Sequence, residues 1–574
     1  MSQETSPSSP PAPAGAKPSA RLRRELDQIL SVRADAREDR LLASPNLGAL
    51  VALLPPEEFY FTLKELDPDN VPEVLRHARS EQVEFVLDLE LWRKDRLRPE
   101  RVLPWLERLH SCGREALARW LRRLELGTWV LLLSRVATVH LADDDRDPLQ
   151  DLPGRAPFTV EGRYYVATSA QAEPVVKEIF QTLRAADPER YARVVEALMR
   201  DVDSELEEGE YQDRQRRLAL RGFPEWEEAL EVYARLEAAA PEALPRKPGA
   251  PGREPESAPE APPRYPVTLP AAAPDYFLHA LRRVPPGQAL DGLWSELAYL
   301  TNKVAVADGL DLDQLESFQG ALRKVTAYVS IGLESLCGAD EGQAARVLEE
   351  HWLQHLFRAG WTPIRALRAR ARKLFDKGWP QGHKERLLFL DPPLPEVLEG
   401  LLRVHPLWFA GEGEVPAYRT FRTLTEVRRA GRAVEQADFL GRFLLGAVDL
   451  HLGDLRQALT RLDTENLKGS TVFLTALVNA ALDRSFRFAP IERAAVRRGL
   501  GRVWASETPP RRVKPGLGDT AVEWAKALQP LSPAEEGYLR EFVGSCFALL
   551  EEQFGHLAQD EVPDPRFTRG LWIA

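Results

Sequence analysis

The sequence contains little cysteine or methionine and no long apolar run. Its 574 residues include only 3 Cys and 2 Met. Three cysteines in so long a chain exclude a disulfide framework and indicate a reducing compartment. The most apolar stretches, residues 128–134 and 469–482, are shorter than the ~20 apolar residues that a membrane span needs. We therefore expect a cytoplasmic protein with no membrane partner.

The sequence also lacks the short motifs of common catalytic and cofactor sites. It contains no GxxxxGK[ST], no GxGxxG after an expected strand, no GxSxG, no CxxC and no HExxH. The ten His and three Cys lie singly or in one pair, so spacing alone assigns no nucleophile and base. We therefore expect no cofactor, and we leave open an enzyme whose catalytic groups converge only in the fold.

Proline, by contrast, is abundant, with 46 residues. Eleven of them lie in residues 241–274, interleaved with Ala, Glu and Arg. Such a segment cannot bury enough surface to offset its ordering entropy, so it predicts an extended linker. Five Pro among small residues likewise predict a disordered tail over residues 1–20. The sequence thus predicts two lobes, residues 21–240 and 275–574.

The net charge of −11 is unevenly distributed between these lobes. Residues 21–240 carry 33 basic and 43 acidic residues, whereas residues 275–574 carry 38 and 39. An acidic balance argues against a nucleic-acid partner. Two basic runs, residues 365–373 and 419–432, would bind phosphates or pair with the acidic lobe.

A twelve-residue repeat is visible in the first lobe. Residues 54–65, 66–77 and 78–89 each carry two apolar residues four positions apart, which places both on one helix face. These pairs are Phe59 and Leu63, Val71 and Leu75, and Val83 and Leu87. The first two blocks open with Pro and acidic residues, as helices do in their first turn. The pattern predicts short helices that stack as a solenoid.

An acidic loop and a β-hairpin are predicted next to each other. Asp143, Asp144, Asp145 and Asp147 repel one another unless a divalent cation or a basic partner lies nearby, and a solvated loop is the simpler interpretation. Residues 157–166 alternate apolar and polar side chains around Glu-Gly, which predicts a hairpin. Its aromatic face would pack on the core or form the lip of a groove.

Two further groups have the residue types of a cation site. His351 and His355 are four residues apart, a spacing that zinc sites use on a helix, although an ordinary helix also explains them. Cys337 is a distant candidate for a third ligand. Asp308, Asp311 and Asp313 follow a helical stretch, and helix capping accounts for them without a cation.

Two resemblances accompany these patterns. The helix starts within residues 50–110 resemble the cytosolic superhelical domain of the magnesium transporter MgtE, whose acidic surface takes part in sensing divalent cations. The acidic residues at these starts are Glu57, Glu58, Asp67 and Asp69. Over the whole chain, LDLELWRKDRLRPERVLPWLERL, LPGRAPFTVEGRYYV, LAYLTNKVAVADGLDL and TVFLTALVNAALDRSFRF resemble a bacterial family known only as a domain of unknown function. That resemblance implies no activity.

We therefore expect a mainly α fold. The first lobe would be superhelical or solenoid-like with one small β-hairpin near residues 157–166, and the second lobe α-helical. The favoured function is a non-enzymatic protein-interaction or scaffold module with a protein as partner. The alternatives are a metal-dependent enzyme with a site between helices and a divalent-cation-responsive regulator. The sequence does not predict an oligomeric state.

Overall fold

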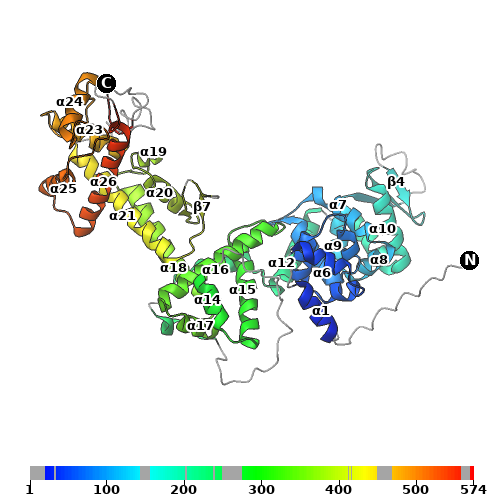
Figure 1. The fold of residues 1–574 in the computed structure, drawn as a ribbon. Helices are drawn as coiled ribbons and strands as arrows, with labels where there is room; N and C mark the ends of the chain where they lie inside the picture. Colours follow the sequence, from blue (N-terminus) through cyan, green and yellow to red (C-terminus); the bar gives the residue numbers. More distant parts are fainter. Residues whose placement is uncertain are drawn as a thin grey trace, which may run out of the picture. The chain divides into compact units, whose positions relative to one another are not determined.

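The described part of the chain is predominantly helical (Figure 1). The computed structural model describes residues 20–30, 34–141, 156–200, 203–236, 240–247, 275–411, 413–414, 417–448, 468–557 and 569–573. Two compact units share these residues. The first comprises Met1–Ala234, Ala240–Val329 and Asp340–Arg358, and the second Arg235–Ala239, Ser330–Ala339 and Ala359–Ala574, as far as each range is described. The mainly α fold class is confirmed.

Short helices dominate the first unit. They are α1 (Ala20–Leu30), α2 (Ala34–Leu42), α3 (Leu47–Leu53), α4 (Pro56–Glu65), α5 (Val71–Leu75), α6 (Ser80–Glu90), α7 (Pro99–Ser111), α8 (Arg114–Arg123), α9 (Leu126–Ser134), α10 (Glu173–Ala186), α11 (Pro188–Arg200), α12 (Asp203–Leu220), α13 (Trp226–Leu230), α14 (Asp275–Arg283), α15 (Gln288–Ala307) and α17 (Glu341–Glu350). Two 3-10 turns, η1 (Glu231–Tyr233) and η2 (Pro241–Ala243), also belong to this unit. Several helices begin with Pro because its missing N–H has no partner in a first turn.

The predicted linker falls mostly outside the described residues. Residues 275–329 belong to the same unit as the N-terminal helices. The lobe boundaries at residues 241–274 stay a prediction, as does the tail over residues 1–20.

Each of the three predicted repeat blocks contains one helix, namely α4, α5 or α6. All six periodic apolar residues are at most 8 % exposed, as their four-residue spacing predicts. Helix α4 packs against both α5 and α6. The stacking of these units as a solenoid stays a prediction.

The predicted hairpin is part of a three-stranded antiparallel sheet. Strands β4 (Ala156–Thr159) and β5 (Tyr164–Thr168) form the hairpin, and β3 (Ala137–Leu141) pairs with the other edge of β5. Phe158 is 7 % exposed and contacts Phe180 of α10, so the aromatic face packs on the core. Elsewhere in the described residues, short two-stranded ribbons join β1 (Trp92–Arg93) to β2 (Arg96–Leu97) and β6 (Trp408–Phe409) to β7 (Tyr418–Arg419).

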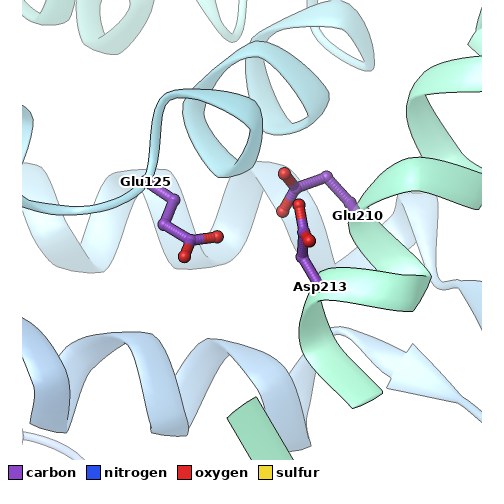
Figure 2. A group of neighbouring side chains, drawn as sticks. All are labelled: Glu125, Glu210 and Asp213. Atoms are coloured by element: carbon purple, nitrogen blue, oxygen red, sulfur yellow. The ribbon is translucent and has the colours of Figure 1, made fainter. Parts of the chain in front are cut away.

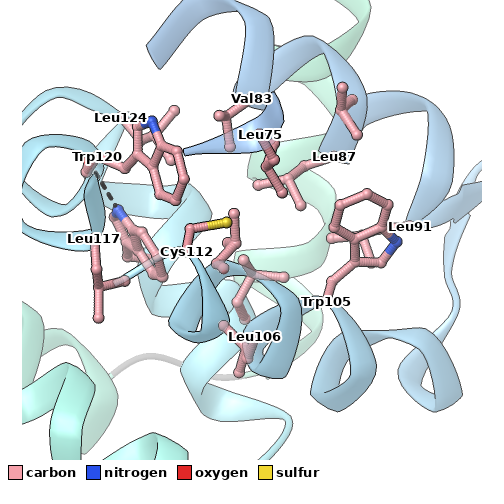
Figure 3. Close-up of a cluster of buried hydrophobic side chains, with 14 of the residues drawn as sticks. Leu75, Val83, Leu87, Leu91, Trp105, Leu106, Cys112, Leu117, Trp120 and Leu124 are labelled. Carbon is pink, nitrogen blue, oxygen red and sulfur yellow. Dashed lines mark hydrogen bonds between the residues drawn. The ribbon is translucent and has the colours of Figure 1, made fainter. Parts of the chain in front are cut away.

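Large aromatic side chains form the centre of the first unit's core. Trp120 of α8 is completely buried among leucines of α5, α6, α7 and α8 (Figure 3). Its indole N–H donates to the Ala78 carbonyl oxygen at 3.1 Å, which satisfies the polar atom that burial would otherwise leave unpaired. The indole N–H of Trp129 in turn donates to the carbonyl oxygen of Trp120 at 3.4 Å.

The helices that lie wholly in the second unit range from four residues in α19 to 24 in α21. They are α19 (Lys384–Leu387), α20 (Leu394–Leu402), α21 (Leu424–Ala447), α23 (Gly469–Ala481), α24 (Arg493–Val503), α25 (Leu517–Leu528) and α26 (Pro533–Phe554). Helices α16 (Leu315–Cys337) and α18 (Leu353–Lys377) contribute residues to both units. Helix α26 begins with a capping box in which Ser532 and Glu535 satisfy each other's backbone N–H groups. No described helix is both long enough and apolar enough to cross a membrane.

We predict that Trp120→Ala lowers the free energy of unfolding by about 3–5 kcal/mol, because it removes a fully buried ring and leaves a cavity. Urea titration measures this change. Trp226→Ala is the matched control: Trp226 is 57 % exposed, so its loss should change the free energy of unfolding by less than about 0.5 kcal/mol. Equal effects of the two variants would contradict the proposed position of the core.

Candidate functional site

The predicted acidic loop lies outside the part of the chain that the structure describes. Asp143, Asp144, Asp145 and Asp147 lie outside the described residues, so their role as a cation- or partner-binding group stays a prediction. Among the acidic helix-start residues, Glu57 and Glu58 are buried in the first turn of α4, whereas Asp67 and Asp69 are exposed.

The two predicted histidines do not share a helix. His351 is the residue after α17 and has an extended backbone, whereas His355 lies in the first turn of α18. His351 is 1 % exposed, and its Nδ1 donates to the Pro245 carbonyl oxygen at 3.0 Å. Burial, followed by the charge of Arg358, lowers the pKa of His355. In the described part of the chain, no third His, Cys, Asp or Glu joins them in a cluster of ligand atoms, so zinc binding here stays a prediction.

The three aspartates after α15 separate into different ion pairs. Asp308 pairs with Lys324 at 2.7 Å, and Asp313 pairs with Arg98 at 3.0 Å. Asp311 lies 3.5 Å from Arg93. Arg98 is 215 residues from Asp313 in the sequence and Lys324 is 16 from Asp308, and these partners account for the carboxylates without a shared cation. Helix capping by these aspartates stays a prediction.

A buried ion pair connects three helices of the first unit. The guanidinium of Arg217 in α12 donates to both carboxylate oxygens of Asp88 in α6, at 2.9 and 2.7 Å. Asp88 is 4 % exposed. Burial raises the pKa of Asp88, while Arg217 opposes that shift. Arg217 also donates to Glu125, which precedes α9, at 2.6 Å.

Three carboxylates gather beside this ion pair (Figure 2). Glu210 and Asp213 project from α12 toward Glu125, and one oxygen of each lies within 4.8 Å of the others. Such oxygens are the ligands that a divalent cation prefers. However, Arg216 lies 2.5 Å from Asp213, and Arg217 lies 2.6 Å from Glu125 and 4.0 Å from Glu210. An ion-pair network therefore accounts for the cluster without a metal.

Glu210 is the buried member of this cluster. It is 6 % exposed, accepts a hydrogen bond from the Thr128 hydroxyl at 3.0 Å, and lies so close to Gly127 that a Cβ there would be 1.9 Å from its Oε1. Burial raises the pKa of Glu210 to about 7, although Arg217 and Thr128 oppose the shift. This carboxyl group therefore exchanges its proton near neutral pH, where an ordinary glutamate is fully ionised.

Helix α12 ends in a Schellman motif. The N–H of Phe223 donates to the Leu218 carbonyl oxygen at 2.9 Å, and that of Gly222 to Ala219 at 3.1 Å. Gly222 has a φ of +82°, which glycine adopts without strain, and a Cβ there would lie 2.9 Å from the Tyr299 ring. Phe223 is buried and contacts Phe85 and Phe318. The segment after α12 is thus fixed to the core.

Beyond this anchor, an apolar surface is exposed to solvent. We call it the Trp226 patch; its side chains and exposed fractions are Trp226 (57 %), Leu230 (37 %) and Tyr299 (40 %). Trp226 and Leu230 are four residues apart on α13, which packs against α15, the helix of Tyr299. The hydroxyl of Tyr299 donates to Glu228 at 3.5 Å, which places the ring beside α13.

Exposed glutamates, which we call the acidic rim, lie in the same segment as Trp226 and Leu230. Four glutamates within residues 225–231 are exposed, namely Glu225, Glu227, Glu228 and Glu231. Arg221 is the only basic residue between positions 220 and 231, and it lies 3.6 Å from the buried Glu57. The segment therefore combines exposed apolar side chains with several carboxylates, of which Glu228 lies 3.8 Å from Lys303 of α15.

Comparison with known proteins identifies a family but no activity. A family of unknown function (DUF6178) matches residues 16–574. The chain belongs to this family. No curated protein and no solved structure gave a significant match, and the local resemblance to MgtE has no support.

The sequence of this DUF6178 protein indicates the Trp226 patch only weakly. Arg-Gly-Phe at residues 221–223 marks a helix end followed by an apolar anchor, and Trp226 stands among glutamates. Periodicity alone would assign Trp226 to a buried face of the next helix. The helix is only five residues long, and Ala229 is its buried residue, which leaves the tryptophan outside.

We predict that Glu210→Gln weakens the pH dependence of stability. The pKa of Glu210 rises from its ordinary 4.5 to about 7 on folding, so the folded state binds the proton more tightly, and stability falls as pH rises through 7. Between about pH 6 and pH 8.5, deprotonation of Glu210 should lower the free energy of unfolding of the wild type by about 1–2 kcal/mol. The variant lacks this group and should not show that loss. Urea titrations at both pH values measure the difference.

Glu125→Gln is the control for this prediction. The Glu125 side chain is 49 % exposed, and the variant retains Glu210, so the wild-type pH dependence should persist. If Glu210→Gln and the wild type lose the same stability over that pH range, the protonated state assigned to Glu210 is wrong.

Proposed function

We propose that this protein is a non-enzymatic protein-interaction module whose Trp226 patch binds a basic, amphipathic segment of a partner protein. The observation that carries the proposal is the 57 % exposure of Trp226 in a segment that also holds four exposed glutamates. Tryptophan is enriched among the residues that dominate protein-protein binding energy, and large exposed apolar groups rimmed by charge are typical of interaction sites.

The chemistry of the patch defines the partner segment. Trp226 and Leu230 would be covered by apolar side chains, because their burial is favourable by roughly 25 cal/mol per Å² of apolar surface. The carboxylates of the rim favour Lys and Arg beside those apolar residues. The acidic balance of residues 21–240 would attract such a segment at longer range.

The backbone that carries the patch is held in place before any partner binds. Phe223 is 2 % exposed, and Gly222 closes the Schellman motif of α12. A surface that needs little reordering loses less conformational entropy on binding. This preorganisation supports a docking role for residues 220–230 over a role as a simple connection between helices.

A pair of synthetic helical peptides tests the proposal. One fluorescently labelled peptide contains only Leu and Lys in an amphipathic pattern, and the other has Glu in place of every Lys. We predict that the full-length protein binds the Leu/Lys peptide, that added salt weakens this binding, and that the Leu/Glu peptide does not bind. Fluorescence anisotropy measures each affinity.

Substitutions test whether the Leu/Lys peptide binds at the Trp226 patch. Trp226→Ala should weaken binding of the Leu/Lys peptide by about tenfold or more, and Glu227→Lys with Glu231→Lys should weaken it as well. Trp352→Ala is the matched control, because Trp352 is 40 % exposed in the same unit but outside the patch. Unchanged affinity in Trp226→Ala, or equal affinity for both peptides, would refute the proposal.

A further inference from the structure

A cavity of about 340 Å³ lies within the second unit. Helices α21 and α26 form its sides, and the residues before α20 and the first turn of α23 close one end. Small-molecule pockets usually have volumes of roughly 300–1,000 Å³. The cavity is therefore large enough for a small organic ligand.

The carboxylate at the closed end is already satisfied by the protein. Asp391 accepts hydrogen bonds from the Ser470 N–H at 2.9 Å and from the Ser470 hydroxyl at 2.5 Å. It thereby caps α23, whose N-cap residue, Lys468, has no side-chain acceptor. The negative charge of Asp391 is thus compensated by the helix terminus, which lessens its attraction for a cationic ligand.

The thiol at this end is suited to packing and not to reaction. Cys546 of α26 is 1 % exposed, and burial, followed by the nearby Asp391, raises its pKa well above the ordinary value. The thiol therefore stays protonated at neutral pH, and a thiolate is the reactive form. Together with Leu394, Leu440, Phe542 and Leu549, it gives the cavity a largely apolar wall.

Arg429 provides the charge that remains available in the cavity. The other lining arginine, Arg432, forms an ion pair with Glu541. Arg429 is exposed at the cavity and has no ion pair among the residues that the structure describes. A guanidinium presents two parallel N–H groups that match a carboxylate.

We propose that this cavity binds a small organic anion with an apolar body, of the class of aromatic or medium-chain carboxylic acids. The carboxylate pairs with Arg429, and the apolar body lies against Phe542, which follows Glu541, the partner of Arg432, along α26. This site is separate from the Trp226 patch and does not depend on the interaction function. Its ligand is defined by one negative charge and an apolar part that fits the cavity.

Calorimetric titration of the full-length protein tests this site with three matched probe pairs: benzoate and benzamide, 4-phenylbutyrate and 4-phenylbutyramide, and octanoate and octanamide. We expect at least one carboxylate to bind about tenfold more tightly than its amide, because only the carboxylate forms a charge-assisted hydrogen bond with Arg429. The amide has the same apolar body and isolates the contribution of the charge.

Three variants locate the binding. Arg429→Gln should abolish the preference for the carboxylate, and Ala433→Trp, which fills the cavity from α21, should abolish binding of both partners in each pair. Arg428→Gln is the control, because it removes an adjacent exposed arginine that does not line the cavity. Thermal unfolding followed by circular dichroism verifies that each variant is folded.

The inference is overturned if none of the three carboxylates binds the wild type. It is also overturned if Arg429→Gln keeps the wild-type preference for the carboxylate, or if folded Ala433→Trp binds as tightly as the wild type. These outcomes leave the peptide binding of the Trp226 patch unaffected, so the two proposals fail independently.

Discussion

The buried ion pair between Asp88 and Arg217 is the interaction on which the arrangement of α6, α9 and α12 depends. A buried carboxylate without a partner costs several kcal/mol, so Asp88 requires a cation at this position. Arg217 meets that requirement with two hydrogen bonds and extends a third to Glu125 before α9. The position of α12 is therefore set by charge as well as by apolar packing.

The surface proposed for binding is a consequence of that constraint. Because Arg217 lies in the last turn of α12, its bonds to Asp88 also position the C-terminal end of that helix and the Gly222 turn. Phe223 then anchors the chain in the aromatic cluster with Phe85 and Phe318. The next helix, α13, is too short to bury all its apolar side chains, and this leaves Trp226 and Leu230 in solvent.

The sequence was informative where a signal is local. The spacing of Phe59 and Leu63 and the Pro residues at helix starts predicted short helices in the observed places, and the alternation in residues 157–166 predicted a hairpin that exists. These signals depend on neighbours within about one turn or one strand pair, and a single sequence contains that information.

The sequence was uninformative where partners are far apart along the chain. Asp88 and Arg217 are 129 residues apart, and Asp391 caps α23 from 79 residues away. Nothing in the local pattern distinguishes these carboxylates from exposed ones. The aspartates at 311 and 313 illustrate the same limit, because each is matched by an arginine that only the fold brings near.

A double-mutant cycle on Asp88 and Arg217 tests the central claim most directly. Urea titration gives the free energy of unfolding of the wild type, Asp88→Asn, Arg217→Met and the double variant. We predict that each single substitution lowers the free energy of unfolding by about 3–5 kcal/mol and that the double variant loses clearly less than the sum. Losses that add to within about 0.5 kcal/mol would show that the two side chains do not stabilise each other, and would contradict the account.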